Sequence, residues 1–362
     1  MSVAYILEPN TSLHREGDRL VAKKDGRSLQ ALHLFKLDQL VLFGSVFLTP
    51  AALSTLLDRN IDTVFMTASG RYRGRLQPPF SKNISLRRDQ FGRLGDERFG
   101  LEIARSIVSG KLANARTMLL RLNRSRQELD LDNAVLSLKQ LSGRASEAED
   151  MDILRGLEGR AAVLYFEGFS KGFLVEGVTF RRRVRRPPTD PVNALLSLGY
   201  TFLFNAVMAS VSAVGFDPYL GCLHCVEYGR PSLALDLMEE WRPVLVDSLV
   251  LSVFNLGILT LDDFVTVQAS EQDVEEAEGA DPLEDPMEDD ADRTSKPRLP
   301  VRLTDSGFRK FITQWERKIN ERIRFHLTGR QLDYRGCIEE QVRHLARVVR
   351  GEEDRYRPMP WK

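Results

Sequence analysis

One long stretch of the chain, from Pro191 to Phe216, carries no charged residue. As a helix it is long enough to cross a bilayer, and a cluster of arginines precedes it, as at many membrane boundaries. Its polar side chains nevertheless make it too polar for a membrane span. These are Asn193, Ser197, Tyr200, Thr201, Asn205, Ser210 and Ser212. We therefore expect a central helix that other helices bury on all sides, and no membrane partner.

The first part of the chain has a different pattern from the part around this stretch. Short β-branched or alternating runs, separated by turn residues, predict strands. These runs are Val3–Glu8, Arg19–Lys24, Ala31–Leu37 and Ile61–Thr67. One short helix is expected between them, with Thr49 as its N-cap and Pro50 at its first position.

Between about residues 81 and 95 the strand signals end, and apolar residues then recur at helical spacing. The predicted helical segments are Phe99–Leu122, Glu147–Phe169, Ala194–Val214 and Leu233–Thr260. The 362 residues are enough for about two domains. We predict an α+β protein with a small N-terminal β-rich domain, residues 1–88, and a larger all-helical C-terminal domain, residues 89–362.

The formal net charge is zero, with 51 Lys and Arg against 51 Asp and Glu, which by itself argues against a nucleic-acid partner. However, the segment 271–292 holds twelve acidic residues and no basic one, so the rest of the chain has 51 basic residues against 39 acidic ones. Like charges at this density repel one another, and we expect a disordered insertion. It is either a solvated linker or an internal mimic of phosphate charge that competes for a basic surface.

The basic surplus is clustered at two places. Three arginines alternate along a predicted strand, which would put them on one face, and five more precede Pro187. Guanidinium groups suit phosphate oxygens and supply affinity that does not depend on base sequence. The alternative is a charged face that is merely solvated. The DNA-binding candidates are Arg71, Arg73, Arg75, Arg181, Arg182, Arg183, Arg185 and Arg186.

The three cysteines cannot form a disulfide framework, and the first ten residues lack the features of a signal peptide. We expect a reducing, cytoplasmic location. Cys222 and Cys225 form a C-x-x-C pair, but no second pair completes a zinc site. We interpret both as small buried residues.

The first candidate for chemistry is Glu158. On a helix it shares a face with Leu154, Ala161 and Tyr165, which places a carboxylate in an apolar stripe. Such burial costs several kcal/mol unless the carboxylate is paired or binds a metal. The two interpretations left open are a core glutamate paired with an arginine and a metal ligand.

The second candidate is a cluster that begins at His224. Asp236, Glu239 and Arg242 follow at intervals of three, on one side of a helix that Pro231 starts and Pro243 bends or ends. Carboxylates with one imidazole suit Mn²⁺ or Mg²⁺ better than structural zinc. An amphipathic helix with a solvated acidic face is the alternative.

These two clusters carry a resemblance to a known family. Leu154–Phe166, Pro191–Leu203 and Gly221–Pro243 together resemble the CRISPR-associated integrase and nuclease of spacer acquisition, the Cas-one (Cas1) family. The segment 37–44, the segments 61–65 and 69–75, and the terminal segments 341–347 and 356–358 also fit. The resemblance covers nearly the whole chain; the acidic insertion departs from the family pattern.

The resemblance implies a metal-dependent enzyme of CRISPR adaptation, an antiviral defence. Glu158, His224 and Glu239 match the family's ligands for Mg²⁺ or Mn²⁺, and Asp236 matches a supporting acid beside them. Arg242 and Tyr200 match positions near the site. Family members form homodimers, and two such dimers flank a dimer of the Cas-two (Cas2) partner in a heterohexamer.

The implied reaction joins the 3′-hydroxyl end of a captured DNA fragment to the CRISPR repeat, by transesterification at phosphorus. With water as nucleophile the same site would act as an endonuclease on double-stranded or branched DNA. Two alternatives remain: a stand-alone nuclease that resolves branched DNA, and a non-catalytic DNA-binding scaffold.

Overall fold

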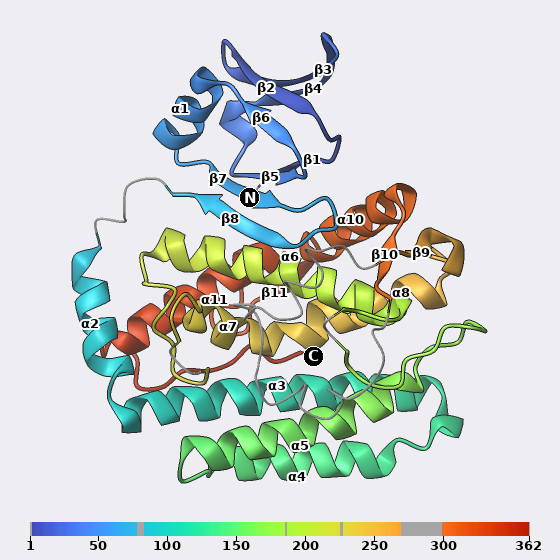
Figure 1. Ribbon diagram of the computed structural model, residues 1–362. Coiled ribbons are helices and arrows are strands. Elements are labelled where there is room, and N and C mark those ends of the chain that lie inside the picture. Colours follow the sequence, from blue (N-terminus) through green and yellow to red (C-terminus); the bar gives the residue numbers. More distant parts are fainter. Residues whose placement is uncertain (1, 78–82, 185–186, 225–226, 269–298, 362) are drawn as a thin grey trace. The chain divides into compact units, whose positions relative to one another are not determined.

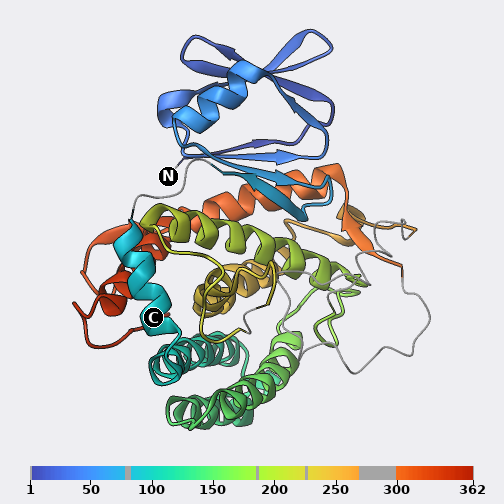
Figure 2. The same ribbon diagram turned by 60° about the vertical axis from the view of Figure 1, so that its left-hand side comes forward.

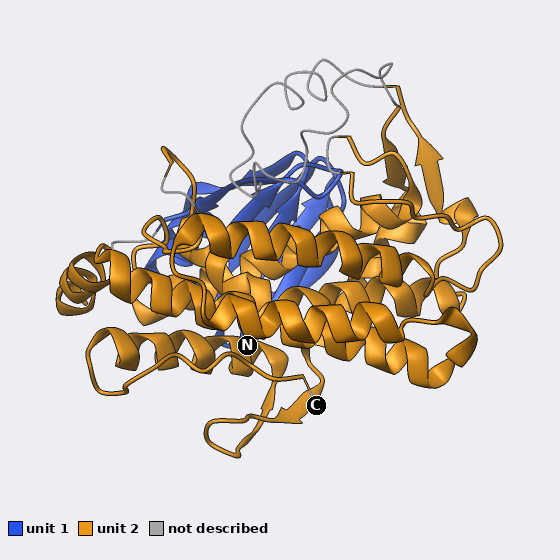
Figure 3. Cartoon of the chain, turned by 90° about the horizontal axis from the view of Figure 1, so that it is seen from below, with its two compact units in different colours: residues 1–82 blue, residues 83–362 orange. Residues whose placement is uncertain are grey.

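The computed structural model describes residues 2–77, 83–184, 187–224, 227–268 and 299–361 (Figure 1). The chain divides into two compact units, Met1–Lys82 and Asn83–Lys362, coloured separately in Figure 3. This division precedes the expected boundary at residues 88–89. Helix α2, Ile84–Leu94, belongs to the second unit, because the Gln90 side chain donates hydrogen bonds to the carbonyls of Asp217 and Leu220.

The first unit contains two four-stranded sheets, as predicted for a β-rich N-terminal region. In the first, β1, β5 and β7 are parallel and β8 is antiparallel to β7. In the second, β4, β3 and β2 form an antiparallel meander and β6 pairs parallel to β2. The strands are β1 Val3–Ile6, β2 Thr11–Glu16, β3 Arg19–Lys24, β4 Arg27–His33, β5 Gln39–Phe43, β6 Val46–Leu48, β7 Asp62–Met66 and β8 Tyr72–Leu76.

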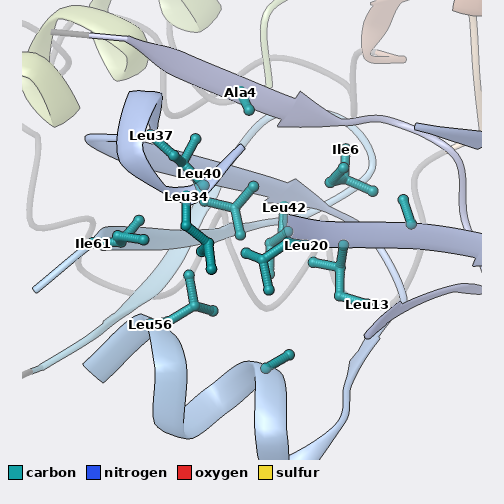
Figure 4. Close-up of a cluster of buried hydrophobic side chains, with 12 residues drawn as sticks. Ala4, Ile6, Leu13, Leu20, Leu34, Leu37, Leu40, Leu42, Leu56 and Ile61 are labelled. Atoms are coloured by element: carbon teal, nitrogen blue, oxygen red, sulfur yellow. The ribbon is translucent and has the colours of Figure 1, made fainter. Parts of the chain in front are cut away.

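Apolar side chains from both sheets and from α1, Pro50–Asp58, form the core of this unit (Figure 4). Leu13 and Leu20 come from one sheet, Leu40 from the other, and Leu56 from the helix, and each is buried. The predicted start of α1 is confirmed, because Thr49 Oγ1 accepts the N–H of Ala52 at 3.3 Å.

The second unit begins with helices that lie side by side after α2 (Figures 1 and 2). They are α3, Glu97–Ser125, α4, Asp132–Ser146, and α5, Met151–Ser170. Carboxylates of Asp96 and Asp150 cap the starts of α3 and α5 by accepting backbone N–H groups. The sequence predicted α3 and most of α5, but no helix was predicted over α4.

Helix α6, Pro191–Val214, fills the centre of the second unit. It is contacted by α7 (Ser232–Met238), α8 (Ser248–Asn255) and α11 (Tyr334–Val349). It begins where Asp190 accepts the N–H of Asn193, and it ends at Gly215, which has φ of 101°. The helix is long and apolar enough for a membrane span, but 94% of its most apolar window is buried inside the protein. The prediction of a buried central helix is confirmed.

The helical segment predicted over Leu233–Thr260 is interrupted, as expected from Pro243. Helix α7, Ser232–Met238, passes into a 3₁₀ turn, Glu239–Trp241, and a π-helical turn, Arg242–Asp247, before α8, Ser248–Asn255. Pro243 lacks the N–H that a regular helix requires, so the widened turn lies at the expected bend. Irregular helical turns of this kind often lie at functional sites.

The remaining elements complete the second unit. They are α10, Asp305–Ile319, α11, Tyr334–Val349, and the strand pairs β9, Phe264–Thr266, with β10, Val301–Leu303, and β11, Arg322–Arg324, with β12, Gln331–Asp333. The region is thus mainly helical, with short strand pairs that the sequence did not predict. The expected disordered insertion, residues 271–292, lies outside the described residues, between β9 and β10.

Candidate active site

Helix α5 buries Glu158 on the predicted face, together with Leu154, Ala161 and Tyr165. The partner of the carboxylate comes from α3: Lys111 Nζ lies 2.5 Å from Glu158 Oε1. One interpretation of Glu158 was pairing with an arginine, and the cation found there is a lysine.

The same lysine reaches Glu239, at the end of α7. Its Nζ lies 2.6 Å from Glu239 Oε2, while Arg242 Nη2 lies 2.9 Å from Glu239 Oε1. Burial alone would raise the pKa of Glu239, but the charges of Arg242 and Lys111 outweigh it and hold this pKa at about 2. Glu239 is therefore ionised at neutral pH.

His224 is held by Asp236 from α7. Asp236 Oδ1 lies 2.7 Å from His224 Nδ1 and accepts the backbone N–H of His224 at 2.9 Å. Asp236 Oδ2 accepts the N–H groups of Cys222 and Leu223 at 2.6 and 3.0 Å. The opposite ring atom, Nε2, faces Glu239 and lies 3.9 Å from its Oε1. Asp236 and Glu239 are both fully buried, which excludes a solvated acidic face.

The donor set fits a hard divalent cation. Two carboxylates converge on one cationic group, and the His224 nitrogen that does not contact Asp236 points toward one of them. A histidine fixed by a carboxylate at its other nitrogen is a common arrangement for metal ligands. Within the described ranges, no three His, Cys, Asp or Glu residues already surround a common point, and the Lys111 ammonium stands between the two glutamates.

Tyr200 and Arg242 lie beside this cluster, as expected from their sequence positions. The Tyr200 hydroxyl donates to Asp247 Oδ1 at 2.6 Å, and Tyr165 donates to Asp247 Oδ2 at 2.7 Å. The guanidinium carbon of Arg242 lies 4.9 Å from the Tyr200 ring centroid. Burial raises the pKa of Asp247 to about 6 despite these hydrogen bonds. The ring of Tyr200 thus packs against Arg242, while the Tyr200 hydroxyl is hydrogen-bonded to Asp247.

A small cavity of about 30 Å³ adjoins the cluster and has room for about two water molecules. Glu158, Lys111 and Arg242 form part of its wall, with apolar side chains such as Leu112 and Phe166 around them. Charges in such a partly buried site interact more strongly than charges at an open surface.

The DNA-binding candidates of the first unit do not form one exposed face. Arg71 and Arg73 are exposed, but Arg75 Nε lies 2.9 Å from Asp62 Oδ1 and its side chain is 7% exposed. Arg71 precedes β8, and the register of β8 against β7 shifts at Phe65 and Met66. A bulge of this kind breaks the alternation on which the expectation rested.

The second arginine cluster also separates into inward and outward side chains. Arg181 and Arg182 are exposed, whereas Arg183 donates to Asn193 Oδ1 at 2.8 Å and to Ser197 Oγ at 2.9 Å. The candidates Arg185 and Arg186 lie outside the described residues, as does Cys225; Cys222 is half-buried.

Lys111 was not identified from the sequence, although a signal exists. It lies in the buried stripe of α3 that includes Ala104, Val108 and Ala115, where a lone lysine needs a buried partner. A lysine amid several other basic residues of that helix did not stand out.

A second buried carboxyl group adjoins the site. Glu240 accepts hydrogen bonds from the Tyr356 hydroxyl at 2.8 Å and from the N–H of Met359 at 2.7 Å. Burial raises the pKa of Glu240 to about 8. The Asn114 amide donates to the carbonyls of Glu240 and Met359. These bonds tie the terminal segment to the residue next to Glu239.

Comparison with known proteins identifies the relatives of this chain. The family model described as "CRISPR associated protein Cas1" matches residues 4–273. A protein of Thermus thermophilus described as CRISPR-associated endonuclease Cas1 is 36% identical over 360 residues, which cover 99% of this chain and 97% of that protein.

Two solved structures share the fold. A casposase bound to integration product superposes with a TM-score of 0.81 at 21% identity, covering 99% of this chain and 93% of the other. A Cas6-RT-Cas1–Cas2 complex matches with a TM-score of 0.80 at 24% identity, covering all of this chain and 36% of that one.

Proposed function

The chain belongs to the CRISPR-associated Cas1 family, and from this premise we propose that it is a metal-dependent DNA integrase and endonuclease of CRISPR adaptation. The observation that carries the proposal is the buried convergence of Glu158, Glu239 and His224 on one small region. The name of the Thermus relative supports nuclease activity. The casposase, which was solved with an integration product, supports the joining of DNA ends.

Glu158, His224 and Glu239 would hold Mg²⁺ or Mn²⁺, and Asp236 keeps the histidine in the orientation this requires. When bound, such a cation lowers the pKa of an attacking hydroxyl and neutralises charge on phosphoryl oxygens. The low pKa of Glu239 keeps its carboxylate available at neutral pH. Arg242, supported by the Tyr200 ring, is the side chain best situated to meet a phosphate next to the ligands.

The proposed reaction is a transesterification. The oxygen of a 3′-hydroxyl on the captured fragment forms a bond to phosphorus and releases its proton. The bond from that phosphorus to the 3′-oxygen of the repeat strand breaks, and this oxygen takes up a proton. One phosphodiester replaces another, so no external energy source is needed. Water in place of the 3′-hydroxyl gives hydrolysis, the endonuclease activity.

The exposed arginines supply the remaining affinity for DNA. Arg71, Arg73, Arg181 and Arg182 are open to solvent and suit phosphate contacts, which position a duplex without reading its sequence. Homodimers and a Cas2 partner complete the proposed assembly. The Cas1–Cas2 complex with which the fold superposes supports the Cas2 partner.

The experiment that tests the function compares integration by wild type, Glu158→Gln and His224→Ala. A labelled fragment is offered to a repeat-bearing plasmid with Mg²⁺ or Mn²⁺. Both variants should lose at least about a hundredfold in rate while retaining DNA affinity. Glu167→Gln, an exposed glutamate of the same helix, is the matched control and should integrate at the wild-type rate.

The integration assay and a calorimetric measurement of Mn²⁺ binding together separate the alternatives. Cleavage of branched DNA without joining indicates a stand-alone nuclease. A non-catalytic scaffold predicts that wild type binds no Mn²⁺ in calorimetry. Integration by Glu158→Gln or His224→Ala at the wild-type rate would show that the ligand assignment is wrong.

A further inference from the structure

Lys111 contacts both Glu158 and Glu239. Its Nζ lies 2.5 and 2.6 Å from the two carboxylate oxygens, and its side chain is 15% exposed. The two oxygens belong to different helical segments, α5 and the turn after α7. The ammonium therefore holds together two carboxylates that would otherwise repel each other.

The charges around this contact are nearly balanced. Glu158, Glu239 and Asp236 are three carboxylates. Of the two cations beside them, Lys111 contacts both glutamates and Arg242 contacts Glu239. The Arg242 guanidinium occupies one oxygen of Glu239 and Lys111 the other. Lys111 and Arg242 thus neutralise part of the carboxylate charge that a bound divalent cation would also neutralise.

The lysine and a divalent cation would compete for these two carboxylates. A magnesium or manganese ion bonds carboxylate oxygens at about 2.1 Å, closer than the distances at which Lys111 already contacts them. An ion bound to both glutamates would lie within about 5 Å of the ammonium, where like charges in a partly buried site repel strongly. Binding of the ion must therefore either displace Lys111 or occur with lower affinity because the ammonium stays close.

We propose that Lys111 is a built-in competitor of the metal ion: it bridges Glu158 and Glu239 in the metal-free protein and lowers the affinity of the site for divalent cations. The inference rests on the proposed function, since it assumes that these carboxylates bind a cation. Lys111 is accordingly a positioning residue. It keeps the two carboxylates together before the ion arrives and sets the cation concentration at which the site fills.

The test measures Mn²⁺ binding by calorimetry to wild type, Lys111→Met and Lys111→Arg. Lys111→Met should bind Mn²⁺ about tenfold more tightly, because the competing charge is gone. Lys111→Arg keeps a cation and should stay within about threefold of wild type. Lys139→Met, an exposed lysine of the neighbouring helix α4, is the matched control and should bind as wild type does.

Thermal unfolding provides a second measurement. Without metal, Lys111→Met should melt at a lower temperature than wild type, because Glu158 and Glu239 lose their shared counter-ion. Saturating Mn²⁺ should raise its melting temperature by more than it raises that of wild type. A lysine that only supports the fold would give the opposite binding result, since its loss would loosen the ligands and weaken Mn²⁺ binding.

The outcomes distinguish this inference from the proposed function. If wild type binds Mn²⁺, Glu158→Gln does not, and Lys111→Met binds equally or more weakly than wild type, the role of Lys111 is wrong and the metal site stands. If wild type and Glu158→Gln bind Mn²⁺ alike, the metal site itself is wrong. If Lys111→Met does not fold, Lys111→Gln takes its place in the same comparison.

Discussion

Asp236 Oδ1 contacts both the ring and the backbone of His224, at 2.7 Å from Nδ1 and 2.9 Å from the backbone nitrogen. One carboxylate oxygen thereby fixes the position of the residue and the orientation of its imidazole. Since Nδ1 is engaged, Nε2 is the atom left to face Glu239. Asp236 acts on the site through the histidine.

Replacing Asp236 with Asn should weaken Mn²⁺ binding about 10- to 100-fold, because an amide supports the ring orientation less well than a carboxylate. Calorimetry checks the affinity, and circular dichroism checks that the helices persist. Asp152→Asn, on the exposed side of α5, is the control. An Mn²⁺ affinity equal to that of wild type would mean that Asp236 has no role in orienting His224.

The loop that carries His224 should tolerate no side chain at Gly221. A Cβ there would lie 2.4 Å from Asp236 Oδ2 and 2.7 Å from the carbonyl carbon of Ser232. Gly221→Ala should therefore lower the free energy of unfolding by about 1–3 kcal/mol. Gly159→Ala, in helix α5, meets no atom within 4 Å and should raise it by up to about 1 kcal/mol. Urea titrations measure both; equal stability of the two variants contradicts the crowding at Gly221.

Sequence patterns predicted most of the features that depend on the local spacing of apolar and capping residues. The buried face of Glu158, the uncharged helix α6 and the cap at Thr49 follow from local spacing, which helices and their ends determine directly. The 3₁₀ and π-helical turns after α7 were missed, apart from the bend at Pro243, because apolar spacing does not distinguish them from a regular helix. Helix α4 was also missed, although its buried residues Val135, Leu138, Leu141 and Ala145 recur at helical spacing.

The candidate ligands were expected from the family resemblance, but the lysine that contacts two of them was not. Lys111 is distant in sequence from Glu158 and Glu239, and no local pattern links them. The exposure of the arginines also escaped prediction, since the register shift in β8 and the hydrogen bonds of Arg183 are tertiary features.

Tyr200→Phe should affect stability more than catalysis. It removes the hydroxyl that donates to Asp247 at 2.6 Å but keeps the ring beneath Arg242. The loss of a buried hydrogen bond should cost about 1–3 kcal/mol of unfolding free energy. The integration rate, measured below the melting transition, should stay within about threefold of wild type. Tyr200→Leu removes the ring as well, and its rate should fall further; a large loss for Tyr200→Phe alone would assign the hydroxyl a direct role.

Deleting residues 271–292 tests whether their charge competes with DNA. The flanking strands β9 and β10 pair with each other, and the N–H of Val301 donates to the carbonyl of Pro188, which follows the arginine cluster 181–186 in the sequence. Competition predicts roughly tenfold tighter DNA binding at low salt and a vanishing difference at high salt. A variant with all twelve acids changed to Gln and Asn should match the deletion; unchanged affinity at low salt leaves the linker interpretation.

Glu240 should make stability fall as pH rises. Its folded-state pKa of about 8 lies above the usual value of 4.5, so the native protein keeps the proton that the unfolded chain loses. The stabilisation is fully present below about pH 4.5 and is lost as pH rises through 8, with a slope of up to about 1.4 kcal/mol per pH unit between these values.

Glu240→Gln replaces this carboxyl group with a neutral group of the same shape, so it should remove that part of the pH dependence. Urea unfolding between pH 5 and 9 measures it as the difference between wild type and variant. The shifted groups Asp247 and His344 are present in both proteins and cancel in the difference. The free energy of unfolding of the variant minus that of wild type should increase as pH rises to about 8. Above that pH the difference should stay constant. Parallel curves would mean that Glu240 is ionised in the folded protein despite its burial.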